Sequence, residues 1–151
     1  MWIQLESTDE FPAAFEPGHV LGLGIQQDHG TMRHAYTISR ANPELRQFGH
    51  LYRVIPDGRM TPHLATLRAG DSISFHGPFH TPIQNEIRDA AERIVLAGTG
   101  TGVGPLFGYA EKALNEAEAR PIALYCGFHR EADMCLTAEL EALAGSYSNF
   151  T

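Results

Sequence analysis

The sequence predicts a two-domain protein of the α+β and α/β classes, in which a small antiparallel β-barrel over residues 1–86 precedes a parallel α/β domain over residues 87–151. Three observations support this prediction. Short apolar runs separated by turn residues fill the first half, which is typical of a small barrel or sandwich. A polar and charged stretch over residues 84–92 then marks a boundary. Beyond it the pattern changes to strand, helix, strand, helix, which implies a parallel sheet.

Turn residues bound the expected strands of the first half. Asp28-His29-Gly30 is a hairpin signal, Pro56-Asp57-Gly58 closes the third strand, and Gly77-Pro78 ends the fourth. Between the third and fourth strands, Thr61 can cap a short helix that begins at Pro62. The four strands are expected over residues 20–25, 33–39, 51–55 and 72–76.

Residues 93–114 organise the second half of the chain. The apolar run over residues 94–97 is typical of a strand with both faces covered, and Pro105 is tolerated as the first residue of the helix that follows. Apolar residues recur behind Pro105 at helical spacing. The pattern continues with a strand over 122–128, a helix whose apolar residues run from 134 to 143 and which Gly145 ends, and the first residues of a third strand over 147–151.

A glycine-rich turn joins that strand to its helix and contains Gly98, Gly100, Gly102 and Gly104. Such a turn leaves backbone N–H groups at a helix N-terminus free to bind a phosphate, although glycines also serve to pack a helix closely on a strand. The G-x-G-x-x-G dinucleotide fingerprint fails at Val103 or Pro105, and no lysine stands where a G-x-x-x-x-G-K phosphate loop needs one. The strand over 122–128 also ends without the acidic residue that would hold a ribose hydroxyl. The turn therefore predicts a nucleotide that is bound in another way.

The composition argues against several classes of protein. The net charge of -7 disfavours nucleic acid or an anionic membrane as the main partner. No apolar run approaches the length of a membrane span, and the first residues lack the order of a signal peptide, so we expect a cytoplasmic protein. Two cysteines are too few for a disulfide scaffold, and the 8 histidines are scattered, so we expect no metal site. A hydrolase is disfavoured because neither G-x-S-x-G nor H-E-x-x-H occurs.

Three short blocks occur in order along the chain: H-A-Y-T over 34–37, V-I-P-D-G-R-M-T-P-H-L over 54–64 and G-T-G-V-G-P over 100–105. Together they resemble the ferredoxin-NADP(H) reductase family of flavoprotein oxidoreductases, most closely its bacterial ferredoxin/flavodoxin reductases. The first block is similar to the R-x-Y-S/T signature that holds the flavin, and the second to the segment that cradles the FAD pyrophosphate. The third is similar to the G-T-G-x-A/G-P turn that meets the pyridine nucleotide. The resemblance covers nearly the whole chain and implies an FAD-binding β-barrel followed by an NAD(P)-binding domain.

The resemblance also implies roles for individual residues. Tyr36 would lay its ring against the flavin, and Thr37 would offer its hydroxyl to the reactive flavin nitrogen. Cys126 would be the small polarizable side chain that lets the nicotinamide and flavin rings meet. These three residues are the catalytic candidates. The cofactor-binding candidates are His34, Ala35, Tyr36, Thr37, Tyr52, Arg53, Val54, Arg59, Met60, Thr61, Gly100, Thr101, Gly102, His129 and Arg130.

Each of these roles has a simpler alternative. Tyr36 is also explained as a tyrosine of the barrel core, and Thr37 by ordinary strand propensity. The residues around Thr61, which would face the pyrophosphate, are also explained by helix capping. Cys126 on an apolar strand is more often an inert core residue.

Two substitutions and the length depart from the family pattern. His34 replaces the usual arginine and would hold a diphosphate less firmly, and Arg33 points to the other face of the strand unless the strand has a bulge. His129, followed by Arg130, stands where relatives often place an arginine for the 2′-phosphate, so the choice between NADPH and NADH stays open. We expect fewer strands than in family members. The second domain is therefore expected to be truncated, and the chain to be a fragment, a minimal relative or one piece of an assembly.

The residues and the resemblance together predict an FAD-dependent oxidoreductase that moves hydride or electrons between NAD(P)H and an acceptor. The expected cofactors are FAD and either NADP(H) or NAD(H). The expected acceptor is a small redox protein such as ferredoxin or flavodoxin, or another molecule. The alternative is a truncated, non-catalytic module that binds flavin or acts as a regulatory or interaction partner.

Overall fold

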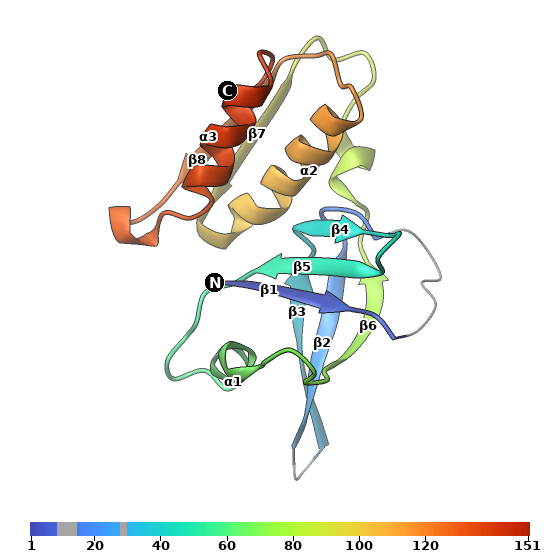
Figure 1. Cartoon of the computed structure of the whole chain (residues 1–151), viewed down its shortest axis with the longest axis vertical. Helices are drawn as coiled ribbons and strands as arrows, with labels where there is room; N and C mark the ends of the chain where they lie inside the picture. Colours follow the sequence, from blue (N-terminus) through green and yellow to red (C-terminus); the bar gives the residue numbers. More distant parts are fainter. Residues whose placement is uncertain (9–14, 28–29) are drawn as a thin grey trace.

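The computed structural model describes residues 1–8, 15–27 and 30–151. It contains an antiparallel part, built from β1 to β6, and a parallel part, built from β7, α2, β8 and α3 (Figure 1). The predicted fold class, an antiparallel barrel followed by a parallel α/β domain, is therefore confirmed. The hairpin turn predicted at Asp28-His29 lies outside the described residues.

Two three-stranded antiparallel sheets form the first part. Their shared core contains Phe15, Phe48 and Phe75, which meet edge to face with ring centroids 5.3 to 6.0 Å apart. One sheet has the order β1 (Trp2–Glu6), β5 (Gln47–Leu51), β4 (Arg40–Asn42), and the other has the order β3 (Gly30–Thr37), β2 (Val20–Gln27), β6 (Ser74–Phe79). The buried core residues are Phe15, Leu21, Leu23, Ile25, Ile38, Phe48, Tyr52, Met60 and Leu64.

Several strand predictions differ from the structure. β1 and β4 were not predicted. β4 has only three residues, whereas β1 does carry an alternation, with Ile3 and Leu5 packed against the core and Gln4 and Glu6 exposed. The third strand is Gln47–Leu51 rather than 51–55, and its three central residues are all buried, so no alternation marks it. β3 ends at Thr37 because the next two residues cross between the sheets, with the Ser39 N–H bonded to the Gly49 carbonyl at 2.8 Å.

The fourth strand, β6, continues through Gly77-Pro78, so the prediction that these residues end it is wrong. A proline removes a backbone donor and is tolerated only at sheet edges and irregularities. β6 is an edge strand, and its pairing with β2 shifts in register between Val20 and Gly22. Both conditions are therefore met at this position.

The predicted helix is α1 (Met60–Thr66), which begins two residues before Pro62. The prediction that Thr61 caps α1 is wrong, because no side chain forms a cap there. The Thr61 hydroxyl instead accepts a hydrogen bond from the Ile55 N–H at 2.9 Å. This bond closes the turn that leads into the helix.

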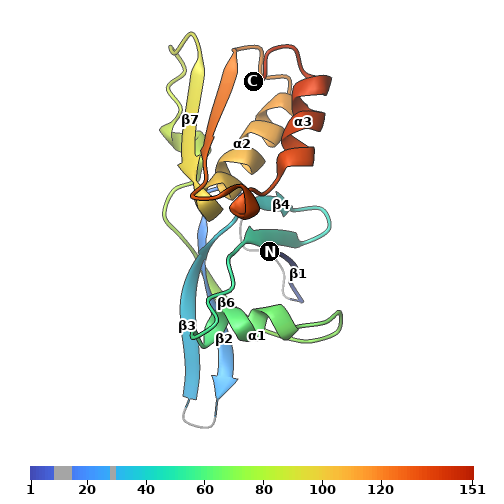
Figure 2. The same ribbon diagram turned by 90° about the vertical axis from the view of Figure 1, so that its left-hand side faces the viewer.

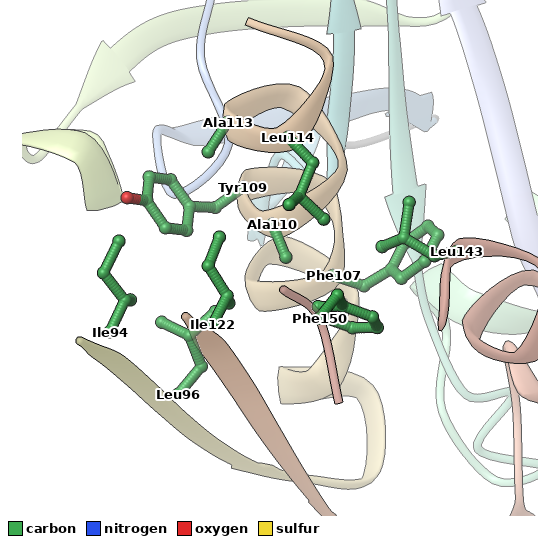
Figure 3. Packing of buried hydrophobic residues seen from close by; sticks show 10 residues of the cluster. All are labelled: Ile94, Leu96, Phe107, Tyr109, Ala110, Ala113, Leu114, Ile122, Leu143 and Phe150. Carbon is green, nitrogen blue, oxygen red and sulfur yellow. The ribbon is translucent and has the colours of Figure 1, made fainter. Parts of the chain in front are cut away.

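The second part is a parallel sheet with both helices on one side (Figure 2). β7 (Ile94–Thr99) pairs with β8 (Ile122–Gly127), and η1 (Ile83–Glu86) precedes β7. Residues 149–151 pair with the other edge of β8, where the Ile122 N–H donates to the Asn149 carbonyl at 2.8 Å. The predicted start of a third strand over 147–151 is therefore confirmed for residues 149–151, whereas Tyr147 and Ser148 lead into it from the end of α3. α2 (Val103–Asn115) and α3 (Thr137–Ser146) pack on the sheet over the core that Figure 3 shows.

The helices of this part depart from the predicted bounds. α2 begins at Val103 rather than Pro105, and α3 continues through Gly145 instead of ending there. The expectation that both faces of 94–97 are covered is wrong for the described residues. Because α2 and α3 lie on the same side of the sheet, Val95 and Tyr125 on the other face are 58% and 66% exposed.

The two parts are joined along α2. A Cβ at Gly108 would overlap the carbonyl oxygen of Ser39, so the helix lies directly on the barrel there. Beside this contact, Glu111 forms a bidentate ion pair with Arg40, with Nε–Oε2 and Nη2–Oε1 distances of 2.6 Å and 2.5 Å. The Arg40 guanidinium also lies 4.8 Å from the centroid of the Phe107 ring. These contacts fix the middle of α2 against the barrel.

Candidate functional site

Two adjoining cavities lie where the barrel meets the N-terminal end of α2. The larger has a volume of about 790 Å³ and the smaller a volume of about 360 Å³. Leu51, Tyr52, Arg53 and Thr101 line both cavities, so we describe the two together as the cleft. One wall of the cleft comes from the barrel and the other from the parallel part.

The cleft brings together most of the residues that the sequence predicts to bind cofactors. They come from all three sequence blocks, which are far apart along the chain. In the smaller cavity the predicted residues are Ala35, Tyr36, Thr37, Tyr52, Arg53, Thr61, Thr101 and Gly102. In the larger cavity they are Tyr52, Arg53, Val54, Gly100, Thr101 and His129.

Tyr36 belongs both to the barrel and to the cleft. It pairs with Leu21 on β2, so its side chain starts from the core face of the sheet, and it packs against the buried core while lining the smaller cavity. Burial, and to a smaller extent the nearby Tyr52, raise the pKa of Tyr36. Thr37 follows at the end of β3, with its side chain exposed at the cleft. Tyr36 therefore packs against the barrel core and lines the cleft at the same time.

His34 stands where the family usually has an arginine, and Arg33 precedes it in the chain. His34 is exposed and pairs with Leu23. The register of β2 and β3 runs without a shift from Val20↔Thr37 to Gln27↔Gly30, so no bulge turns Arg33 toward the face of His34. Arg33 therefore does not take the place of the missing arginine.

Several predicted residues do not line the cleft. Met60 is 2% exposed and its side chain belongs to the barrel core. Arg59 is exposed, and its Nη2 donates to the Gln27 side-chain oxygen. Cys126 is half-buried, on the face of β8 opposite the exposed Tyr125. Arg130 and Cys126 are both absent from the residues that line the two cavities.

The glycines of the turn serve two purposes. Gly98 and Gly104 are needed for packing, because a Cβ at these positions would lie 2.8 Å from Leu106 and 2.5 Å from Ser39, respectively. Gly100, with a φ of +53°, and Gly102 face open space, since a Cβ there would meet nothing within 4 Å. Both belong to η2 (Gly100–Gly102) and line the cleft. The packing and phosphate-binding alternatives for this turn thus fall on different glycines.

The N-terminal end of α2 has no side-chain cap among the described residues, and its first turn contains no acidic residue. The Val103 N–H donates to the carbonyl oxygens of Gly100 and Thr101, and Pro105 has no N–H. The positive end of the helix dipole, rather than a set of free N–H groups, therefore makes this end favourable for an anion. Thr101 and Gly102 line the cleft immediately before the helix.

Sequence reasoning named His129 and Arg130 after β8 but missed three further residues of this segment. Asp133, Met134 and Cys135 line the larger cavity together with His129. Asp133 ends the short helix η3 (Glu131–Asp133), so the acidic residue absent from the end of the strand stands a few residues later. Burial raises the pKa of the Cys135 thiol above its ordinary value. An acidic residue in the loop after the second parallel strand was the available signal.

The described residues contain no candidate metal centre. No group of three His, Cys, Asp or Glu side chains that could hold a metal ion occurs among them. None of the helices in this part of the chain is both long and apolar enough to cross a membrane. A third cavity, of about 360 Å³, lies between β4, β5 and α2 beside Arg40 and Glu111, and none of the predicted site residues lines it.

Two family models match the chain. The model described as the oxidoreductase FAD-binding domain matches residues 4–82. The model described as the oxidoreductase NAD-binding domain matches residues 96–151. The two matches therefore fall on the antiparallel and the parallel part, respectively.

Two relatives illustrate the likeness in sequence. The reductase subunit of an aromatic O-demethylase from Amycolatopsis sp. is 31% identical over 144 residues, which cover 92% of this chain and 42% of the relative. NADH-cytochrome b5 reductase 2-A from Vanderwaltozyma polyspora is 32% identical over 93 residues, which cover 61% of this chain and 31% of the relative. The chain thus spans less than half the length of these relatives.

Solved structures agree with these matches. A cytochrome P450 reductase from Amycolatopsis superposes with a TM-score of 0.79 and 29% identity, covering 99% of this chain and 45% of that protein. A ferredoxin NADP+ reductase from Neisseria gonorrhoeae, solved with FAD and NADP, superposes with a TM-score of 0.76 and 20% identity, covering 99% of this chain and 58% of that protein. At this identity the second likeness concerns the fold alone.

Proposed function

Because the chain belongs to the ferredoxin-NADP(H) reductase family of flavoprotein oxidoreductases, we propose that it is an NAD(P)H-dependent flavoprotein reductase. The observation that carries the proposal is the cleft, where residues of all three sequence blocks line one connected space. Hydride transfer needs two bound rings in contact, and a cleft with one wall from each part of the chain provides for that. The proposed domains are residues 1–86 for FAD and 87–151 for the nucleotide.

The smaller cavity suits a flavin ring. Tyr36 offers an aromatic surface and Thr37 a hydroxyl group on one wall, while Thr101 and Gly102 stand on the other. Bound FAD would supply the hydride-accepting chemistry that no side chain of the protein possesses. The protein's own part is to hold the ring, orient it and exclude water. Cys126 stays a catalytic candidate whose side chain lies outside the cavity lining.

The pyrophosphate of FAD would lie toward the start of α1. The exposed His34 and the neighbouring Ala35 would contribute from β3, and Arg59 from the turn before the helix. Because the Met60 side chain is buried in the core, only its backbone N–H is available for this purpose. Thr61 lines the cavity, but its hydroxyl already accepts the bond from Ile55.

The larger cavity suits the nicotinamide nucleotide. Gly100 leaves space beside Thr101 for a phosphate, near the N-terminal end of α2. His129 and Asp133 line the same cavity. These residues would hold the adenosine end of the nucleotide, with Arg130 next to them in sequence.

We further propose that NADH is the preferred donor. Asp133 lines the larger cavity, whereas Arg130 and Arg120, the two arginines nearest to it in sequence, do not. Arg53 lines the same cavity, but it comes from the barrel. A 2′-phosphate beside Asp133 would bring two negative charges close to its carboxylate, whereas a free ribose hydroxyl can donate a hydrogen bond to it. Beside Asp133 the charge therefore favours the unphosphorylated ribose.

The electron acceptor is proposed by likeness. The similar proteins include reductase partners of a cytochrome b5, of an aromatic O-demethylase and of a naphthalene dioxygenase system, according to their names. We propose that this chain likewise passes electrons to a small redox protein, such as ferredoxin or flavodoxin, in the cytoplasm. None of the three sequence blocks identifies that electron acceptor.

Anaerobic mixing of the FAD-reconstituted protein with NADH tests the proposed function. Loss of the flavin absorbance on addition of NADH, with a weaker response to NADPH, is the expected result. A protein that stays colourless after incubation with FAD, or whose flavin neither nucleotide bleaches, contradicts it. The Asp133→Asn variant is the control for nucleotide preference, because it removes the carboxylate without changing the size of the side chain.

One observation favours a second function, that of a non-catalytic flavin-binding or interaction module. The face of the parallel sheet away from α2 and α3 leaves Val95 and Tyr125 exposed, and exposed apolar residues on a sheet face are typical of a contact surface. Such a module would bind FAD and turn yellow, yet NADH would not bleach it. The same anaerobic experiment therefore separates the two functions.

A further inference from the structure

His50 is a fully buried histidine that links the two sheets of the barrel. Its side chain lies on β5, in one sheet, and is 0% exposed. Its Nδ1 atom lies 2.9 Å from the carbonyl oxygen of Thr37, at the end of β3 in the other sheet. The imidazole ring also meets Tyr36 edge to face, with a distance of 6.1 Å between ring centroids. His50 thus contacts both residues proposed to hold the flavin ring, although none of the three sequence blocks contains it.

The hydrogen bond defines the tautomer of His50. A carbonyl oxygen only accepts hydrogen bonds, so Nδ1 must carry the hydrogen. Burial lowers the pKa of His50 to about 4, against the smaller raising effect of the bond to Thr37, so the ring is neutral at pH 7. Nε2 then carries no hydrogen, and it has no hydrogen-bond partner in the described part of the chain. The polar function of the side chain therefore consists of its bond to Thr37.

We propose that His50 is a positioning residue that holds the Tyr36–Thr37 segment in place for the flavin. Thr37 is the last residue of β3; the Ile38 N–H still bonds to the His19 carbonyl, and the Ser39 N–H then bonds to Gly49 in the other sheet, so Thr37 lies next to the crossing between the sheets. The hydrogen bond from the Nδ1–H of His50 restrains the Thr37 carbonyl, and the edge of the imidazole ring restrains Tyr36. His50 lines neither cavity, so it would act through these two residues. The inference rests on the proposed function, because it requires FAD to lie against them.

Three substitutions separate the hydrogen bond from the ring. His50→Phe keeps a ring beside Tyr36 but removes the donor. His50→Asn keeps a donor at the position of Nδ1 and removes the rest of the ring, whereas His50→Gln places its donor at the position of Nε2. A single hydrogen bond of ordinary strength corresponds to about a fivefold to tenfold change in an equilibrium constant. We expect Phe and Gln to weaken FAD binding by about that factor, and Asn to restore it to within about twofold.

Quenching of flavin fluorescence on binding to the apoprotein gives the FAD dissociation constant of each variant. The visible circular dichroism of the bound flavin reports how the ring is set in its site, and the melting temperature of each apoprotein measures a purely structural role. The proposal expects the dissociation constant and the dichroism to follow the donor at the Nδ1 position. Unchanged FAD affinity in His50→Phe, or an equal loss in the Phe and Asn variants, overturns it.

Nitrogen NMR of wild-type protein labelled at histidine keeps the proposal testable if a variant does not fold. The expected spectrum shows His50 as the Nδ1–H tautomer, with and without FAD, and an Nε2–H tautomer overturns the proposal. A wild-type protein that does not bind FAD at all contradicts the proposed function itself. FAD binding that is indifferent to the donor at position 50 overturns only the role of His50.

Discussion

Alanine substitutions at Gly108 and Gly102 separate the two purposes of the glycines in and after the turn. A Cβ at Gly108 would overlap the Ser39 carbonyl oxygen, which is backbone and cannot rotate away, whereas a Cβ at Gly102 meets nothing within 4 Å. Alanine in a helix interior gains about 1 kcal/mol over glycine. Overpacking at a close contact costs about 3 kcal/mol, because α2 must move away from the barrel. We therefore expect Gly108→Ala to lower the free energy of unfolding by about 2 kcal/mol.

Gly102 is expected to behave in the opposite way. Its backbone is already helical, with a φ of -65°, so alanine should change the free energy of unfolding by less than about 1 kcal/mol. Gly102 lines the smaller cavity next to Thr101, which lines both cavities, so the added methyl group would narrow the cleft where we propose that the nicotinamide meets the flavin. We expect NADH binding to weaken about tenfold, which corresponds to about 1.4 kcal/mol.

Thermal unfolding and NADH titration of both variants, under conditions where both are folded, provide the assay. For a chain of this size about 2 kcal/mol corresponds to a fall in melting temperature of about 4 to 8 °C. Gly108→Ala should show that fall with NADH affinity close to wild type, and Gly102→Ala should show weak NADH binding with a nearly unchanged melting temperature. The reasoning is refuted if Gly102→Ala is the less stable variant, or if it binds NADH as the wild type does.

Three further predictions follow from other contacts. Glu111→Gln breaks a partly exposed ion pair with Arg40, so it should lower the free energy of unfolding by about 1 kcal/mol and also slow flavin reduction by NADH. Glu118→Gln, whose ion pair with Arg120 lies within the parallel part, should affect stability alone. Equal rates of flavin reduction in the two variants would contradict this prediction. Asp133→Asn should raise the use of NADPH relative to NADH by about tenfold, measured as the ratio of reduction rates with the two donors, and an unchanged ratio would contradict the proposed preference. The pKa of His50 is lowered from 6.5 to about 4 on folding, so the unfolded chain takes up the proton first; stability is complete above about pH 6.5 and should fall by about 3 kcal/mol as the pH drops to about 4. Denaturant unfolding at several pH values checks this last prediction, and His50→Phe should lose that part of the pH dependence.

The three sequence blocks could be located without the structure because each depends on particular residues at fixed spacing. Tyr36 and Thr37 follow each other on one strand, and the open glycines flank Thr101 in a single turn. Their meeting in one cleft depends on how α2 lies on the barrel, through the contact of Gly108 with Ser39. That contact involves residues far apart in the chain, so no local pattern indicates it.

The failures of prediction have physical causes in the same kind of distant contact. β1 alternates Ile3 and Leu5 with the exposed Gln4 and Glu6, but so short a pattern becomes a strand only through its pairing with β5. The Thr61 hydroxyl had two partners available, and the bond from the Ile55 N–H displaced the helix cap. Asp133 reaches the cleft through the short helix after β8, which sequence periodicity does not mark.

Hydrogen exchange with and without FAD tests most directly whether one cleft between the two parts of the chain holds the cofactor. The account predicts that FAD slows amide exchange in residues 35–37 and 53–61 of the barrel and, at the same time, in residues 100–103 of the parallel part. Protection confined to one of the two parts, or the same exchange with and without FAD, would contradict it.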